Sequence, residues 1–206
     1  MLPIGEDMTP HFWGGRLCLA AVNSILWRRS DAPVERIEGY PDLVRHVGRA
    51  GLLESPEALV AAAEADPGAA RRALARAVEL REALFGLFSA VTAGREPATG
   101  ELAVLNASLS EGLGRLVVRP VAGGYRAGWP HPAALDLPRW QVAVSAGQLL
   151  TSAERDRIKQ CPGEPCGWLF VDASRNRSRR WCDSRECGNR ERVRAHYQRT
   201  RATRGG

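Results

Sequence analysis

Four cysteines near the C-terminus constrain this chain more than any other feature. They form two pairs, each with four residues between its members, and fifteen residues separate the pairs: Cys161, Cys166, Cys182 and Cys187. Two such pairs are typical of structural zinc sites, in which both tight turns share one metal. Zinc favours thiolates, so four of them complete a tetrahedral site without another donor. The spacing therefore predicts one structural zinc per chain at these cysteines.

Charge is distributed unevenly along the chain. Residues 1–150 hold 15 Lys and Arg against 16 Asp and Glu, a net charge of −1, whereas residues 151–206 hold 14 against 7, a net charge of +7. The two parts sum to the +6 of the whole chain. A neutral body with a basic C-terminal module is typical of a protein whose C-terminus binds phosphates. A solvated basic tail has the same composition and stays an alternative.

A basic helix is predicted over residues 189–201, directly after the second cysteine pair, with Asn189 as its N-cap. Guanidinium groups are planar and permanently charged, which suits phosphates and guanine edges. The helix and the segment before it supply the predicted nucleic-acid-binding residues: Arg175, Arg177, Arg179, Arg180, Arg190, Arg194 and Arg201. Val193 and Tyr197 lie beside the helix arginines and are expected to pack inward.

Several residues near the cysteines also have a purely structural interpretation. A structural role of Arg190, in which it pairs with Asp172 or braces the cysteine turns, fits the sequence as well as DNA contact does. Trp168, Phe170 and Trp181 are expected to cover the apolar side of the metal site rather than to stack on bases. In this alternative the zinc only holds the C-terminus together.

The same stretch resembles the CGNR zinc finger of bacterial proteins. The resemblance is carried by Trp168-Leu169-Phe170-Val171-Asp172, by Ser174-Arg175-Asn176 with Arg179-Arg180-Trp181-Cys182, and by Cys187-Gly188-Asn189-Arg190. It covers about the last fifth of the chain. That family is described as stress-induced transcriptional regulators with an N-terminal ABATE-type domain. The resemblance implies a zinc-containing regulator with DNA as its partner, whose body serves sensing or assembly, with a small-molecule effector and a homodimer as possible further partners.

The rest of the chain predicts a mostly helical body over residues 1–155, followed by the zinc module over residues 156–206. After an extended lead-in over residues 1–14, apolar periodicity and helix-start signals predict helices over residues 16–29, 41–50, 55–66, 68–93, 100–113 and 138–157. Alternating residues around Gly123-Gly124 predict a β-hairpin over residues 115–129. The expected fold class is therefore mostly α with a small β-hairpin (α+β), ending in a treble-clef-like or ribbon-like four-cysteine module with a final helix.

The first predicted helix resembles a Leu-x-Leu-Asp-Phe-x-Asn-Thr segment of the family, here over residues 17–24. Ala20 and Ala21 replace its Asp and Phe, so a ligand-binding role of that Asp does not transfer to this chain. Asn23 remains as a candidate ligand-binding residue, although the favoured interpretation is an Asn that pairs with a packed polar neighbour. Cys18 is expected to be a small buried hydrophobe.

The sequence lacks the signatures of several other protein classes. No apolar run approaches the roughly 20 residues of a membrane span, and the N-terminus has no secretion-signal pattern. Cysteines in metal spacing suit a reducing cytoplasm. No Gly-rich phosphate loop, GxSxG or HExxH motif occurs, and four thiolates close a zinc site to substrate, so no catalytic residue is predicted. The chief alternative is an enzyme or small-molecule-binding protein whose pocket lies in the body, with a purely structural zinc, and a third is a protein-interaction module.

Overall fold

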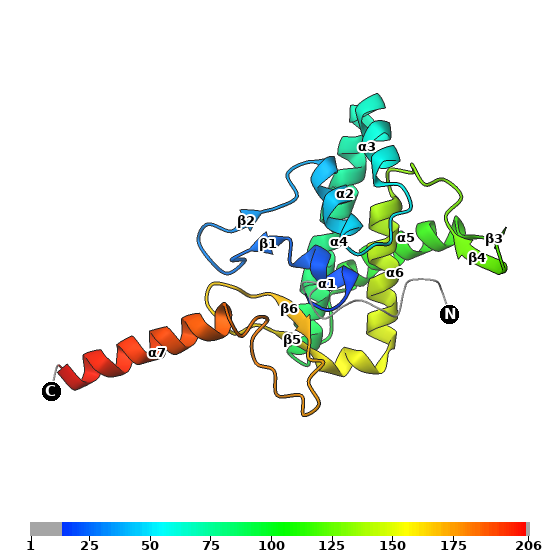
Figure 1. Ribbon diagram of the computed structural model, residues 1–206. Helices are drawn as coiled ribbons and strands as arrows, with labels where there is room; N and C mark the ends of the chain where they lie inside the picture. The colour runs from blue at the N-terminus through cyan, green and yellow to red at the C-terminus, as the bar shows by residue number, and fades with distance from the viewer. Residues whose placement is uncertain (1–13, 205–206) are drawn as a thin grey trace.

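Helices build most of the protein (Figure 1). The computed structural model describes residues 14–204, and the lead-in predicted over residues 1–14 lies outside them except for Gly14. In chain order the helices are α1 (Leu17–Val22), α2 (Tyr40–Gly48), α3 (Pro56–Ala65), α4 (Pro67–Thr92), α5 (Thr99–Gly114), α6 (Leu137–Thr151), the 3₁₀ helix η1 (Ala153–Arg157) and α7 (Cys187–Arg204). The predicted mostly helical class with small antiparallel β structure is confirmed.

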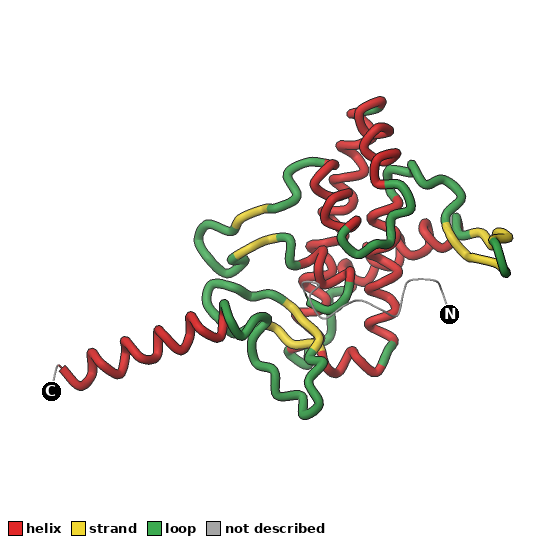
Figure 2. The backbone as a smooth tube through the Cα atoms, viewed as in Figure 1, coloured by secondary structure: helices red, strands yellow, loops and turns green. Residues whose placement is uncertain are grey.

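Three short antiparallel hairpins lie at the margins of the helices in the described part of the chain (Figure 2). They pair β1 (Ile25–Leu26) with β2 (Val34–Glu35), β3 (Val117–Val121) with β4 (Gly124–Gly128), and β5 (Ile158–Gln160) with β6 (Leu169–Val171). The β3–β4 hairpin occurs where the alternating pattern predicts it. The β1–β2 pair was not predicted, because two-residue strands are too short to show an alternating pattern.

The first helix ends earlier than its apolar pattern predicts. α1 ends at Val22 instead of continuing to Arg29, and the chain turns into β1. Asn23 makes this turn and binds the backbone of Leu169 in β6 with both ends of its amide: Nδ2 donates to the carbonyl oxygen at 2.8 Å, and Oδ1 accepts from the N–H at 3.0 Å. Trp27 then has a φ of 49°, which a right-handed helix does not accommodate. Contacts with a distant strand override local helix propensity here.

The core is organised around α4. Leu80, Leu84, Leu87 and Phe88 are each 0% exposed, at the i, i+4, i+7 and i+8 spacing of one helix face. α1, α5 and α6 all contact this helix. Burial of one such side chain contributes about 1.5–3 kcal/mol, so this row is a principal source of stability in the body.

The β5–β6 hairpin extends the same core into the C-terminal region. Ile158, Leu169 and Val171 belong to the buried cluster of the helices, whereas Phe170 packs with the cysteines in a second cluster. Because successive side chains of a strand point to opposite faces, β6 joins the helical core to the cysteine site. The division into units over residues 1–155 and 156–206 stays a prediction.

α7 extends away from the rest of the protein (Figure 1). Val193 is 46% exposed and Tyr197 is 66% exposed, so the expectation that they pack inward is wrong. The reason is geometric, because α7 leaves the body at the zinc site and runs outward. Of the helices that the structure describes, none has the length and apolar character needed to cross a membrane.

Candidate metal centre

The four predicted cysteines come together in one site. Their sulfur atoms all lie within 4.8 Å of one another, with 3.5 Å between Sγ of Cys166 and Cys182 and 3.6 Å between Sγ of Cys182 and Cys187. Zinc–sulfur bonds of about 2.3 Å in a regular tetrahedron place the sulfurs about 3.8 Å apart. The cluster has this size, so the four cysteines are positioned to bind one metal ion. Cys18 is 0% exposed in the helical core, as expected.

The electrostatics of the four thiols also favour a cation at this site. Hydrogen bonds from Cys166 and Cys182 lower the pKa of Cys161 from 9.0 to about 2. Hydrogen bonding to Cys161 raises the pKa of Cys166 to about 12 and raises the pKa of Cys182 as well, and burial raises the pKa of Cys187. Crowded thiolates repel one another, so proximity disfavours the simultaneous ionisation of all four thiols without a cation. A divalent ion supplies the charge that lets all four sulfurs act as thiolate ligands.

The first cysteine pair is held at the open end of the β5–β6 hairpin. The N–H of Cys161 donates to the carbonyl of Trp168 at 2.7 Å, and the N–H of Cys166 donates to the carbonyl of Gly163 at 2.7 Å. The indole Nε1 of Trp168 donates to the carbonyl of Ile25 in β1 at 2.9 Å. These bonds fix the first cysteine turn to the body.

The second cysteine pair lies at the start of α7. The helix begins at Cys187, two residues before the predicted N-cap Asn189. Asp183 orders the turn that leads into the helix, because its Oδ1 accepts hydrogen bonds from the N–H groups of Arg185 at 2.6 Å and Glu186 at 3.0 Å. The prediction of Asn189 as the N-cap is therefore wrong, because Asn189 lies inside the helix.

Asp172 orders the arginine-rich segment between the two pairs. It is 0% exposed. Its Oδ1 accepts from the N–H of Ser174 at 2.9 Å and from its hydroxyl at 2.5 Å, and its Oδ2 accepts from Nζ of Lys159 at 2.6 Å and from the N–H of Arg179 at 3.0 Å. Burial raises the pKa of Asp172, but the hydrogen bonds from Lys159 and Ser174 outweigh burial and hold the pKa well below its ordinary value of 3.8.

Lys159 is a site residue that sequence reasoning missed. It occupies the position beside Asp172 that one interpretation gave to Arg190, and it also donates to the carbonyls of Arg177 at 2.6 Å and Arg179 at 3.0 Å. The available signal was its rarity, because Lys159 is the only lysine in the sequence. A lone lysine among many arginines indicates a site that accommodates a compact ammonium group but not the larger, planar guanidinium group of arginine.

Two family matches agree with this arrangement. Residues 15–153 match ABATE, described as "Putative stress-induced transcription regulator". The chain belongs to the ABATE family. Residues 157–200 match the CGNR zinc finger and contain all four cysteines. No curated protein matches the chain.

The finger match and the cysteine cluster confirm the prediction of a single structural zinc site in this ABATE family member. The two matched ranges meet between residues 153 and 157. From here on, "the CGNR finger" means residues 157–200.

The arginines between the cysteine pairs of the CGNR finger differ in their surroundings. Arg175, Arg177 and Arg180 are exposed. Arg179 is half-buried and braces the site: its Nε donates to the carbonyl of Trp181 at 2.9 Å, its Nη2 donates to the carbonyl of Cys182, and its guanidinium carbon lies 4.6 Å from the ring centre of Phe170. The nucleic-acid role of all four stays a prediction.

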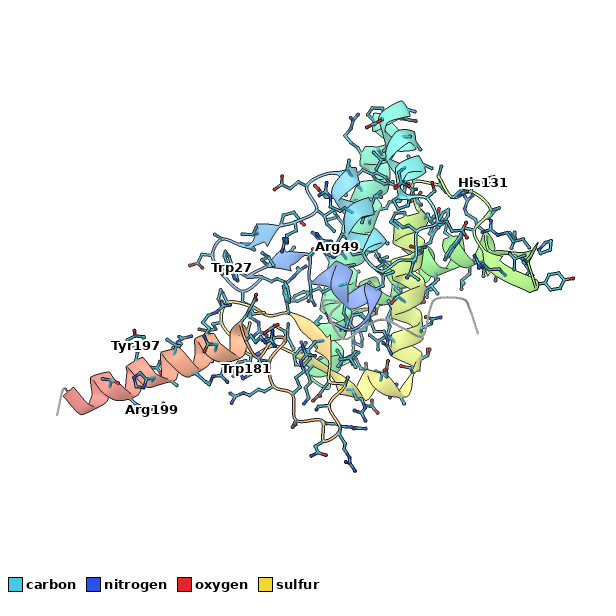
Figure 3. All side chains as sticks on the ribbon, in the orientation of Figure 1. Trp27, Arg49, His131, Trp181, Tyr197 and Arg199 are labelled. Atoms are coloured by element: carbon cyan, nitrogen blue, oxygen red, sulfur yellow. The ribbon has the colours of Figure 1, made fainter. Side chains whose placement is uncertain are left out.

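The arginines of α7 are less engaged with the rest of the protein. Nη2 of Arg190 lies 4.0 Å from Sγ of Cys187. Arg194 forms ion pairs with Glu164 at 3.1 Å and Glu191 at 4.0 Å. Arg201 is placed by its backbone alone, within α7. Figure 3 shows Trp181 at the base of this helix, and Tyr197 and Arg199 farther along it on different sides.

Asn23, the candidate ligand-binding residue, binds β6 and is not part of the cysteine cluster. It is 1% exposed, and its amide binds Leu169 as described above. This geometry matches the interpretation of Asn23 as a packing residue. A ligand role for Asn23 stays a prediction.

Proposed function

We propose that this protein is a cytoplasmic transcriptional regulator that binds DNA through its CGNR finger. The observation that carries the proposal is α7, whose 18 residues include six arginines and one acidic residue. At about 1.5 Å per residue the helix is about 27 Å long. Beyond its first turns it leaves the body, so its charge is available to a partner (Figure 1).

The shape of α7 suits duplex DNA. The major groove is about 12 Å wide and admits an α-helix. Arginines at several angles around a helix can reach phosphates on both strands as well as base edges between them. The exposed side chains of Val193 and Tyr197 are too few for a helix bundle and compatible with contacts to thymine methyl groups and sugars.

A second basic element supports the same proposal. Arg175, Arg177 and Arg180 project from the segment that Asp172 orders between the two cysteine pairs. The metal ties this segment to the start of α7 through Cys182 and Cys187. One zinc thus fixes the relative positions of two arginine-rich elements, which favours binding to a regular array of phosphates.

The test is the salt dependence of binding to random duplex DNA by the zinc-loaded full chain. Each neutralised phosphate contributes about −0.9 to the slope of log K against log salt. Arg194→Ala and Arg201→Ala should each flatten that slope by about one unit. Arg71→Ala, an exposed arginine near the start of α4, is the matched control and should leave the slope unchanged. A folded protein with one zinc and no salt-dependent binding to any nucleic acid contradicts the proposal.

A cavity in the body favours a second candidate function, binding of a small molecule. Its volume is about 410 Å³, within the roughly 300–1,000 Å³ of ligand pockets. Its lining is mostly apolar and includes Leu113, Leu116, Trp129 and Val144. We infer a small, mostly apolar ligand with a hydrogen-bond donor, which in a regulator would be the effector.

Gln141 places a hydrogen-bond acceptor in the wall of this cavity. The residue lines the cavity and is 4% exposed. Its Nε2 donates to the carbonyl of Leu52 at 2.7 Å, whereas its Oε1 has no hydrogen-bond partner among the described residues. A buried oxygen without a partner costs about 1–3 kcal/mol. A small rotation of the amide toward a ligand that donates a hydrogen bond would recover part of that energy.

Thermal-shift measurements with small aromatic amides and amines test this second candidate. A compound that stabilises the wild type should stabilise Gln141→Leu much less. Gln148→Leu, on the exposed side of α6, is the control and should respond like the wild type. If a compound stabilises the wild type and both variants equally, it binds outside this cavity.

A further inference from the structure

A second hollow, of about 500 Å³, lies where the body meets the CGNR finger. Its wall is formed by the C-terminal end of α4, by β5, by the chain after β1 and by the segment between the cysteine pairs. Four basic residues line it: Arg29, Lys159, Arg179 and Arg180. No carboxylate is among the described residues of its lining. The hollow is therefore basic, and it combines residues of two matched regions.

Arg29 belongs to the body, yet the finger holds it in place. Its N–H donates to the carbonyl of Pro165 at 3.0 Å. Its side chain lies across Gly167, where a Cβ would be 3.0 Å from Cγ and 3.1 Å from Nε of Arg29. Gly167 also has a φ of 71°, which side chains rarely adopt. Glycine at position 167 therefore leaves the space that the Arg29 side chain fills.

The four basic groups are not equally available to a ligand. Nζ of Lys159 already binds Asp172, and Arg179 donates to two backbone carbonyls. Arg29 and Arg180 are exposed, and neither forms an ion pair with a carboxylate among the described residues. The guanidinium carbon of Arg180 lies 4.8 Å from the ring centre of Trp181, which limits its freedom. Two restrained guanidinium groups without a counter-ion suit an oxyanion, because their planar donors match phosphate oxygens.

We propose that this hollow binds a backbone phosphate of a nucleic acid, with Arg29 and Arg180 as its ligands and with Lys159 and Arg179 adding positive potential. The inference rests on the proposed nucleic-acid-binding function and extends the interface beyond the finger. Arg29 lies in the ABATE region and Arg180 in the CGNR finger, so one phosphate is held by both.

Duplex DNA titrations of the zinc-loaded full chain at several salt concentrations test the proposal. Arg29→Ala and Arg180→Ala should each weaken binding about fivefold near 0.15 M salt and flatten the log–log slope by about one unit, as expected for one lost phosphate contact. Arg29→Lys should recover part of the loss. Arg71→Ala removes the same charge from the far end of α4 and should match the wild type.

The outcomes separate this inference from the proposed function. If the wild type binds DNA in a salt-dependent way and neither Arg29→Ala nor Arg180→Ala changes that binding, the proposed phosphate site is wrong. The proposed DNA-binding function then still stands. If the wild type binds no nucleic acid but binds inorganic phosphate or ATP through Arg29, the source of the phosphate is a small molecule and the inference is wrong. If it binds none of these, the inference and the function both fail.

The zinc content of Arg29→Ala shows whether Arg29 instead stabilises the metal site. Arg29 lies close to Cys166, and its charge could instead offset the anionic thiolates. Loss of zinc in Arg29→Ala would indicate that role, and Arg180→Ala then decides the question. A flattened slope with one zinc per chain in Arg180→Ala supports the phosphate site, and an unchanged slope overturns it.

Discussion

The β5–β6 hairpin and α7 lie within the same CGNR match, yet the protein holds them in different ways. Leu169 of β6 is 0% exposed in the helical core, whereas Val193 and Tyr197 of α7 are 46% and 66% exposed. β6 is bound by Asn23 of the body, whereas α7 is attached through the ligand Cys187 and the first turns of the helix. The zinc therefore fastens an exposed basic helix to a hairpin that the body already holds.

Removal of a zinc ligand should have the largest effect and should separate the two regions. Cys182→Ser should reduce zinc from about one equivalent to far below one, because three thiolates leave the tetrahedron open. Metal binding contributes on the order of 10 kcal/mol in zinc-finger peptides. Amide hydrogen exchange should then rise over residues 174–200 and stay slow at Leu169 and along α4.

Cys18→Ser is the control for this variant, because Cys18 lies in the core and away from the metal. It should keep its zinc by elemental analysis. Equal deprotection of α4 and α7 in Cys182→Ser would show that the metal stabilises the whole protein, and the contrast between the two regions would be lost.

Leu169→Ala should act on the body although the residue lies in the finger. Leucine-to-alanine changes at fully buried sites cost about 2–5 kcal/mol. Denaturant unfolding followed through α4 should therefore show a loss of about 3 kcal/mol. Val118→Ala is the control, because Val118 is 70% exposed. An unchanged midpoint in Leu169→Ala would indicate that the body folds without β6 and would favour the predicted boundary near residue 155.

The sequence was sufficient for the parts of the site that short-range spacing determines. The four cysteines, the hairpin around Gly123 and the final helix all follow from local patterns. The missed features depend on pairs far apart in the chain. Asn23 binds Leu169 and thereby ends α1 early, Lys159 satisfies Asp172, and Arg29 lies against Gly167. Local periodicity contains no information about such pairs, because each partner alone fits several roles.

Asp172→Asn should have a smaller effect, confined to the segment between the cysteine pairs. Hydrogen bonds to a charged group contribute about 1.5–3 kcal/mol, so a loss of about 2 kcal/mol at pH 7 is expected in urea unfolding. The folded-state pKa of Asp172 lies below its ordinary 3.8. The stabilisation is therefore fully present well above pH 3.8 and is lost as the pH falls below that value.

The difference between the wild type and Asp172→Asn should accordingly shrink as the pH is lowered from 5 to 3, where both lose stability for other reasons as well. Ser184→Ala, an exposed site in the second cysteine turn, is a control that should follow the wild type. Parallel curves for the wild type and Asp172→Asn would mean that this carboxylate does not act as an anion in the folded protein.

Tyr197→Ala should have the smallest effect on stability. Substitutions at exposed sites usually change the free energy of unfolding by less than about 0.5 kcal/mol, and Tyr197 is 66% exposed and does not belong to the helical core cluster. A change of this size in the free energy of unfolding that does not depend on protein concentration would mean that no second copy covers Tyr197. The outer part of α7 would then be available to DNA. A loss above about 1 kcal/mol that grows with protein concentration would mean that a second copy covers Tyr197. Sedimentation of the wild type and the variant would then show whether the predicted homodimer assembles through α7. In that case the arginines of α7 would be divided between the dimer interface and the nucleic acid.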